Sequence, residues 1–185
     1  MIGASFPALL AAAQGGDEQA FAALWRDLQP AVLRYLRVTA APVAEDLAAD
    51  AWVSVIRGLG RFRGEERHFR AWVLMVARHR AVDWHRQLAR RPTEPLPLEL
   101  LGDLVAPDDP VAAVLEAQST RAALALLTEL PVEQAEVVAL RVLGGLGVAE
   151  VATIMGKRPS AVRLLAHRGL RRLAQRLTAA DLVRV

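Results

Sequence analysis

Cysteine is absent from the 185-residue chain, which excludes disulfide bonds and metal sites built from thiolates. Lysine occurs once, at Lys157, among 23 basic residues, so nearly all of the positive charge is arginine. Aromatic residues make up only 5% of the chain, and alanine and leucine dominate the apolar 54%. An Ala/Leu-rich chain with few aromatic and β-branched residues predicts an all-α fold, long enough to bury a sizeable core.

Long apolar runs are also missing. The stretch AWVLMVA is typical of the longest ones, and it falls far short of the roughly 18 residues that a membrane span needs. The N-terminal segment MIGASFPALLAAAQGGD has no Lys or Arg ahead of its apolar residues, so it lacks the charged start of a secretory signal. We therefore expect a cytoplasmic chain without membrane insertion, and the absence of cysteine agrees with a reducing compartment.

Charge and proline divide the chain into three parts. Residues 1–91 carry 13 Lys/Arg and 9 Asp/Glu, residues 92–118 carry six acids and no base, and residues 119–185 carry ten bases and five acids. Five of the ten prolines lie between Pro92 and Pro110, and proline disfavours helix at and before its own position. We predict two small helical domains, 1–91 and 119–185, joined by a Pro-rich acidic linker, 92–118.

Helical periodicity, interrupted by proline and glycine, predicts four helices in each half. In the N-terminal half they cover about residues 6–13, 17–38, 43–59 and 69–90. In the C-terminal half they cover about residues 111–130, 132–142, 148–155 and 159–177. Asp17 is the expected N-cap of the second helix, and Pro159 suits the first turn of the last one.

The last predicted helix is strongly basic. Residues 156–177 hold seven Lys/Arg and no acid. With about 3.6 residues per turn, the arginines lie opposite an apolar stripe that includes Val162 and Leu165, while Leu164 lies within the charged face. A short helix, a glycine-containing turn and a longer basic helix form a helix-turn-helix, whose second helix enters a DNA major groove. A merely solvated arginine face is the alternative, and Leu164 is suited to either a thymine methyl or a protein contact.

The N-terminal half mixes arginine with aromatic residues. This holds for the loop GRFRGEERH (60–68) and for VLMVARHRAVDWHR (73–86). The combination suits single-stranded nucleic acid, because rings stack on unpaired bases while arginines hold phosphate. We expect Trp52 and Trp72 to lie in the core and Asp83 to pair with a nearby arginine, while the position of Trp84 stays open.

Eight short motifs follow one another along the chain: GDEQAFAAL, AEDLAAD, RFRG, FRAW, ARHRAVD, ELPVEQAEVVALR, GLGVAEVA and VRLLAHR. In this order they resemble the sigma-70 family of bacterial RNA polymerase specificity subunits, in its smallest, extracytoplasmic-function (ECF) group. The resemblance covers about residues 8–178. Each motif is weak alone, but their joint order is highly specific.

The resemblance implies promoter-specific transcription initiation. In this family the helix that bears AEDLAAD docks on the clamp helices of core RNA polymerase, and the same domain captures a flipped −10 base of the non-template strand. The C-terminal domain reads the −35 duplex. The implied partners are core RNA polymerase, promoter DNA and, as a candidate, an anti-sigma factor. No cofactor or metal is implied.

Carried onto this sequence, the resemblance gives three groups of site residues. The polymerase contact falls on Asp46, Leu47, Ala49 and Asp50. The −10 contact falls on Arg61, Phe62, Arg63, Gly64, His68, Phe69, Arg78, His79, Asp83 and Arg86. The −35 contact falls on Arg158, Ser160, Arg163, Leu164, His167, Arg168 and Arg171. Departures from the family pattern at Ala49, His79, Arg158 and Leu164 leave the promoter sequence open.

Three other classes of protein were considered. A stand-alone helix-turn-helix repressor or activator would bind duplex DNA specifically without polymerase, but it leaves RFRG and AEDLAAD unexplained. An enzyme is not expected, because no nucleophile or phosphate-cradling motif is present and His79 and His85 lie about 240° apart on one helix. A helical interaction module without nucleic-acid binding would show little salt dependence of any DNA binding.

Overall fold

Helices form the regular structure of residues 1–90 and 122–183, the part of the chain that this computed structural model describes, with side chains described to residue 177. The N-terminal half contains α1 (Phe6–Gln14), α2 (Glu18–Thr39), α3 (Ala44–Leu59), α4 (Glu66–Arg90) and the short 3₁₀ turns η1 (Gly3–Ser5) and η2 (Ala41–Val43). The C-terminal half contains a helical stretch, 122–128, followed by α6 (Val132–Val138), the π-helical turn η3 (Ala139–Leu143), α7 (Val148–Met155) and α8 (Pro159–Val183). The predicted all-α class is confirmed, whereas the predicted linker and most of the predicted helix 111–130 lie outside the described residues.

Local signals set the junction between α1 and α2. The Asp17 carboxylate accepts hydrogen bonds from the backbone N–H groups of Gln19 (2.8 Å) and Ala20 (3.0 Å), as a helix N-cap does. Gly16 has a φ of 94°, a conformation that glycine adopts without strain. The predicted cap at Asp17 is therefore confirmed.

A distant contact sets the start of α4. This helix begins at Glu66, three residues before the predicted start at Phe69. The Glu66 carboxylate accepts hydrogen bonds from the backbone N–H groups of Ile2 (2.7 Å) and Gly3 (2.8 Å). Because these donors lie more than 60 residues away in the chain, sequence periodicity gave no sign of them.

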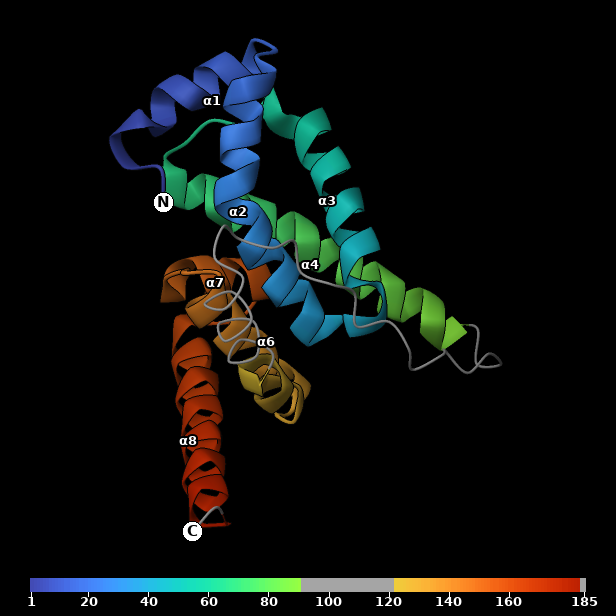
Figure 1. Cartoon of the computed structure of the whole chain (residues 1–185), viewed down its shortest axis with the longest axis vertical. Coiled ribbons are helices and arrows are strands. Elements are labelled where there is room, and N and C mark those ends of the chain that lie inside the picture. The colour runs from blue at the N-terminus through green and yellow to red at the C-terminus, as the bar shows by residue number, and fades with distance from the viewer. Residues whose placement is uncertain (91–121, 184–185) are drawn as a thin grey trace.

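One buried cluster runs through both halves of the molecule. In the N-terminal half it includes Leu24, Tyr35 and Leu74, each 0% exposed, and in the C-terminal half it includes Leu140 and Val151, also 0% exposed. Helix α2 packs against α6 and η3, and α4 packs against α7. Figure 1 shows the C-terminal half below the place where α2 and α4 cross. Burying each large aliphatic side chain contributes about 1.5–3 kcal/mol, so the halves are held together by substantial apolar packing.

The helix-turn-helix is formed by α7, a three-residue turn and α8. Gly156 ends α7 with a φ of 61°, and the Lys157 backbone N–H donates to the Ala152 carbonyl (2.9 Å), as in a Schellman-type helix end. Helix α8 then approaches α6 closely, because a Cβ built on Gly169 would lie 2.8 Å from Val138 Cγ2. The predicted bounds of α7 and the predicted start of α8 at Pro159 are confirmed, while α8 extends past its predicted end at 177.

The predicted helix 132–142 has a different geometry near its end. Regular α6 ends at Val138, and the chain continues as the π-helical turn η3 up to Leu143. Gly144 follows in a tight place, since a Cβ built on it would lie 2.6 Å from the Leu140 carbonyl oxygen and 2.7 Å from Leu74 Cδ1. The wider turn therefore ends where the backbone of the C-terminal half touches the core of the N-terminal half.

Candidate nucleic-acid interface

Helix α8 presents a broad polar face to solvent. All seven residues of the predicted −35 group are exposed: Arg158, Ser160, Arg163, Leu164, His167, Arg168 and Arg171. The opposite side of the helix is anchored by Val162, which is 0% exposed, and by the buried Gly169. Five of the seven, at positions 160, 163, 164, 167 and 171, fall within about 100° of one another at 100° per residue, so one surface can carry them.

The seven bases of residues 156–177 divide into two sets. Lys157 Nζ pairs with Glu133 (2.6 Å), Arg172 Nη1 donates to Gln134 Oε1 (2.9 Å), and Arg176 pairs with Glu129. These three fasten α8 to its own half. Among the described residues, the remaining four form no ion pair: Arg158, Arg163, Arg168 and Arg171. The four unpaired arginines all belong to the predicted −35 group, and guanidinium groups suit base edges and phosphates.

A second polar stripe follows α4. His68, His79, Asp83 and Arg86 are exposed, and their spacing of 11, 4 and 3 residues places them on one side of the helix. Trp72 lies along the same stripe and is half-buried. Arg86 Nη1 lies 3.6 Å from Asp83 Oδ1, so the expected pairing of Asp83 with a nearby arginine is confirmed.

The loop before α4 carries its arginines outward and its phenylalanine inward. Arg61 and Arg63 are exposed, whereas the Phe62 ring is half-buried and stacks on Trp72 with ring centroids 5.2 Å apart and planes at 23°. Gly64 has a φ of 151°, and a Cβ there would lie 3.2 Å from the Phe62 ring, so glycine is the residue that fits this turn. The stacked Phe62 ring therefore holds the turn in place, while Arg61 and Arg63 give its outer side a positive charge.

Two predicted contact residues lie inside the molecule. Phe69 is 1% exposed and packs against the rings of Phe6 and Phe62 with centroids 5.6 Å and 5.3 Å away. Leu47 is 8% exposed and belongs to the main buried cluster. In this conformation neither side chain offers a surface to a partner, because each sits on the inward side of its helix. Phe69 and Leu47 instead pack in the core beneath the exposed residues of α4 and α3.

Arg78 lies apart from the α4 stripe. It is half-buried, and its Nε donates to Glu136 Oε1 of α6 at 2.8 Å. Its position on the helix is about 100° from that of His79, on the side covered by the C-terminal half. The structure therefore does not bring Arg78 together with the exposed members of the predicted −10 group.

Helix α3 exposes a mixed acidic and apolar face. Asp46, Ala49 and Asp50 of the predicted polymerase contact are exposed, and Val53 (44% exposed) and Ile56 (54% exposed) continue the same side toward the C-terminal end. The spacing 46, 49, 50, 53, 56 is that of one helix face. Sequence reasoning missed Val53 and Ile56, although their helical register with Asp46 would have indicated them. Trp52, on the inner side, is 5% exposed, which confirms its predicted core position.

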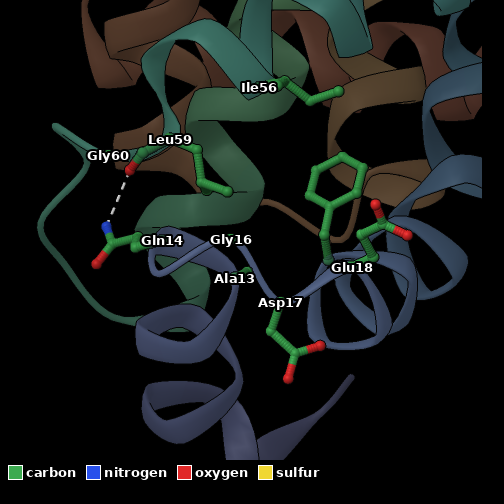
Figure 2. Close-up of a pocket in the computed structure, with 9 residues that line it drawn as sticks. Ala13, Gln14, Gly16, Asp17, Glu18, Ile56, Leu59 and Gly60 are labelled. Atoms are coloured by element: carbon green, nitrogen blue, oxygen red, sulfur yellow. Dashed lines mark hydrogen bonds between the residues drawn. The ribbon is translucent and has the colours of Figure 1, made fainter.

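A shallow hollow of about 320 Å³ adjoins the Ile56 end of this face. It is lined by the end of α1, the start of α2 and the end of α3, including Phe21, Ile56 and Leu59. Figure 2 shows Gln14 bridging the hollow's rim, with its Nε2 donating to the Leu59 carbonyl at 2.9 Å. The same amide nitrogen also lies 2.9 Å from the Phe62 carbonyl, so Gln14 ties α1 to the cationic loop.

Two further features were sought within residues 1–90 and 122–183, a metal site and a membrane-spanning helix. No group of three or more His, Asp or Glu side chains in these ranges is placed to hold a metal ion. None of the helices described combines the length and apolar character that crossing a membrane requires.

Comparison with known proteins identifies the class of protein. A family model described as Sigma-70 region 2 matches residues 24–91, and one described as Sigma-70, region 4 matches residues 120–173. The ECF RNA polymerase sigma factor BldN of Streptomyces coelicolor is 36% identical over 171 residues, which cover 91% of this chain and 64% of BldN. The ECF RNA polymerase sigma factor SigD of Mycobacterium tuberculosis is 33% identical over 189 residues, which cover 97% of this chain and 87% of SigD.

A solved structure shares the fold. The sigma factor RpoE of Bartonella quintana, crystallised with the anti-sigma factor NepR, aligns with a TM-score of 0.67 at 20% identity over 85% of this chain and 96% of RpoE. Fold and sequence matches together define a bacterial transcription initiation factor with two nucleic-acid-binding regions. The chain belongs to the sigma-70 family of RNA polymerase sigma factors, in its ECF group. Its function is to direct promoter-specific transcription initiation.

Proposed function

We propose that the three exposed faces divide the work of this sigma factor. The acidic and apolar face of α3, from Asp46 to Ile56, docks on core RNA polymerase in the cytoplasm. The α4 stripe and the loop before it contact the −10 element. The α8 face reads the −35 duplex. The proposed domains are residues 1–91 and 119–185 with the linker 92–118, and the chain acts as a regulatory subunit without a catalytic step of its own.

The observation that carries the −35 assignment is the sorting of charge on α8. Three bases hold the helix to its own half, while the four unpaired arginines point outward beside Ser160, Leu164 and His167. An arginine that bonds both acceptors of a guanine edge discriminates against the wrong base by about 1–3 kcal/mol. The exposed Leu164, 48% accessible, offers the apolar contact that a thymine methyl favours.

The −10 assignment is supported by the loop and stripe of α4. Exposed Arg61 and Arg63 are suited to phosphates, and the stripe with His79 and Arg86 offers donors to base edges. Flipping a base from the stack costs a few kcal/mol, which stacking and edge contacts offset. Phe62 and Trp72 form a stacked aromatic pair where the loop meets the α4 stripe, and such rings can stack on an unpaired base.

The polymerase assignment is supported by the character of the α3 face. Asp46 and Asp50 carry negative charge at one end, and Val53 and Ile56 provide an apolar end beside the hollow near Phe21. Such a surface suits a helical partner with basic and apolar side chains. RpoE was crystallised with an anti-sigma factor, which supports an anti-sigma factor as a further partner of this chain.

A pull-down of purified core RNA polymerase tests this function. The wild-type chain should retain core polymerase, and the double variant Asp46→Arg/Asp50→Arg should lose it, because both changes replace negative with positive charge on the docking face. Glu65→Arg is the control, since Glu65 is 73% exposed and lies in the loop before α4, outside α3.

Retention by the double variant would place docking elsewhere on the chain. Failure of a folded wild-type chain to retain core polymerase would overturn the proposed function, and specific duplex binding without polymerase would then indicate a stand-alone regulator.

A further inference from the structure

A buried acid joins the two halves of the molecule. Glu136 of α6 is 9% exposed, and its Oε1 accepts hydrogen bonds from Tyr35 Oη of α2 (2.9 Å) and from Arg78 Nε of α4 (2.8 Å). Both donors belong to the N-terminal half. Tyr35 is itself 0% exposed and Arg78 is half-buried, so the contact lies between the halves with the arginine at its edge.

The other buried polar residue of the described core behaves differently. Gln134, two positions earlier on α6, is bonded by Arg172 within its own half. Glu136 receives its recorded bonds only from across the boundary, among the residues described. A buried carboxylate is costly unless it is paired and hydrogen-bonded, so the closed arrangement depends on these donors.

The contact is one that can open and close. If the halves separate, water can reach the carboxylate, the phenol and the guanidinium together, and none is left buried without a partner. If one partner is removed while the halves stay closed, the others remain buried and incompletely bonded. Loss of a single partner therefore favours separation.

The covered side of α4 carries more than the arginine. Leu74, one helical turn before Arg78, lies against Gly144, where a built Cβ would be 2.7 Å from Leu74 Cδ1. Helix α7 also packs on α4. The C-terminal half thus covers one side of α4 next to the exposed His79 stripe, and Arg78 is on the covered side.

We propose that Tyr35, Glu136 and Arg78 form a latch that holds the two halves together in the free chain and withholds Arg78 from nucleic acid. The proposal rests on the proposed function of α4 in binding the −10 strand. Polymerase or promoter DNA opens the latch only to the extent that it binds the open chain more tightly than the closed one. When the latch opens, Arg78 loses its contact with Glu136 and its guanidinium becomes available to bind the −10 strand.

Distance measurements between the halves test the latch directly. The chain has no cysteine, so Gln87→Cys and Gln175→Cys, both at exposed positions, allow spin labels to be attached to α4 and α8 alone. Double electron–electron resonance on the free full-length chain should give one narrow distance distribution. Glu136→Gln and Tyr35→Phe should each add a broader population at longer distance and raise the open-to-closed ratio about fivefold or more.

Glu133→Gln is the matched control. Glu133 lies on the same helix and has the same charge, but it pairs with Lys157 of its own half. It should leave the distance distribution unchanged. Tyr35→Phe removes a single oxygen atom and keeps the ring packing. If circular dichroism shows that Glu136→Gln disturbs the fold, the Tyr35→Phe distance distribution is the test of the latch. An unchanged distribution in Tyr35→Phe would overturn the latch.

Binding of a fluorescent 20-nucleotide oligothymidine tests the second part of the proposal. By anisotropy, Glu136→Gln should bind the strand about fivefold more tightly than wild type, and Arg78→Ala added to it should remove the gain. An equal gain in Glu133→Gln, or separation of the halves without any gain, would overturn the withholding of Arg78. The distance measurement needs no polymerase, so its outcome is independent of the core polymerase pull-down.

Discussion

The two helices proposed to contact nucleic acid, α8 and α4, differ in how much of their surface the rest of the molecule covers. Helix α8 packs along one side, on α6 and α7, and leaves a broad cationic face open. Helix α4 contacts α2, α3 and α7 and, as far as Trp84, leaves only a narrow stripe exposed. In α8, the side chains proposed to bind DNA and those that hold the fold are therefore separate sets. In α4 the two sets alternate within a few residues, so substitutions there act on stability and function together.

The largest effect is expected at the base of the α4 loop. Phe69→Ala removes a ring that is 1% exposed and should lower the free energy of unfolding by about 3–5 kcal/mol. Phe62→Ala removes a half-buried ring and should cost only about 1–2 kcal/mol, yet it should reduce strand opening at the promoter. Urea denaturation measures the first quantity, and permanganate reactivity of unpaired thymines measures the second.

Equal losses of stability in the two variants would mean that Phe62 belongs to the core as fully as Phe69. Normal strand opening in Phe62→Ala would remove this residue from the melting role.

A smaller effect is expected on α8, where binding and folding are separate. Arg163→Ala removes an unpaired exposed guanidinium and should change base preference at one −35 position by about 1–3 kcal/mol without loss of stability. Arg172→Ala removes the hydrogen bond to Gln134 and should cost about 0.5–1.5 kcal/mol of stability while base preference is kept. Competition binding of holoenzyme to −35 variants measures the preference, and an identical shift in both variants would contradict the sorting of charges on α8.

The smallest effect concerns Tyr35, the only tyrosine of the chain. Burial, and then the negative charge of Glu136, raise the pKa of the Tyr35 hydroxyl well above its usual value. An unfolded tyrosine ionises near pH 10, so the unfolded state loses its proton first as pH rises. The stability from neutral Tyr35 is therefore full below about pH 10 and is lost as pH rises through the folded-state pKa.

Ultraviolet absorbance of tyrosinate gives the readout for Tyr35. The native chain should show no tyrosinate signal at a pH where unfolded chain is ionised, and between about pH 8 and 11 Tyr35→Phe should lose less stability than wild type. Titration of the native chain near pH 10 would contradict the buried position of Tyr35 between the halves.

Sequence predicts the features of this molecule that local signals determine. The N-cap at Asp17, the end of α7 at Gly156 and the start of α8 at Pro159 each depend on residues within one helical turn. A helical wheel also predicted the open face of α8, because a helix packed on one side has a simple pattern of exposure. The extended start of α4 escaped prediction, since Glu66 is engaged by the distant backbone of Ile2 and Gly3.

The contact between the halves was the main feature that sequence did not reveal. A linker rich in proline and acid predicted two joined domains and left open how they pack together. In the structure, Leu74 of one half and Leu140 of the other share one buried cluster. The same contact explains Arg78, because nothing in the local pattern distinguishes an arginine that faces solvent from one that meets Glu136 from a segment 58 residues away.

Transcription from a random promoter library by core polymerase and this chain tests the central claim most directly, namely that one sigma factor reads DNA through two separate faces. The transcribed sequences should share two elements at a fixed spacing. Arg163→Ala should alter only the upstream element, and His79→Ala/Arg86→Ala only the downstream one. Selection of a single element, or alteration of both elements by either variant, would contradict the division of reading between α8 and α4.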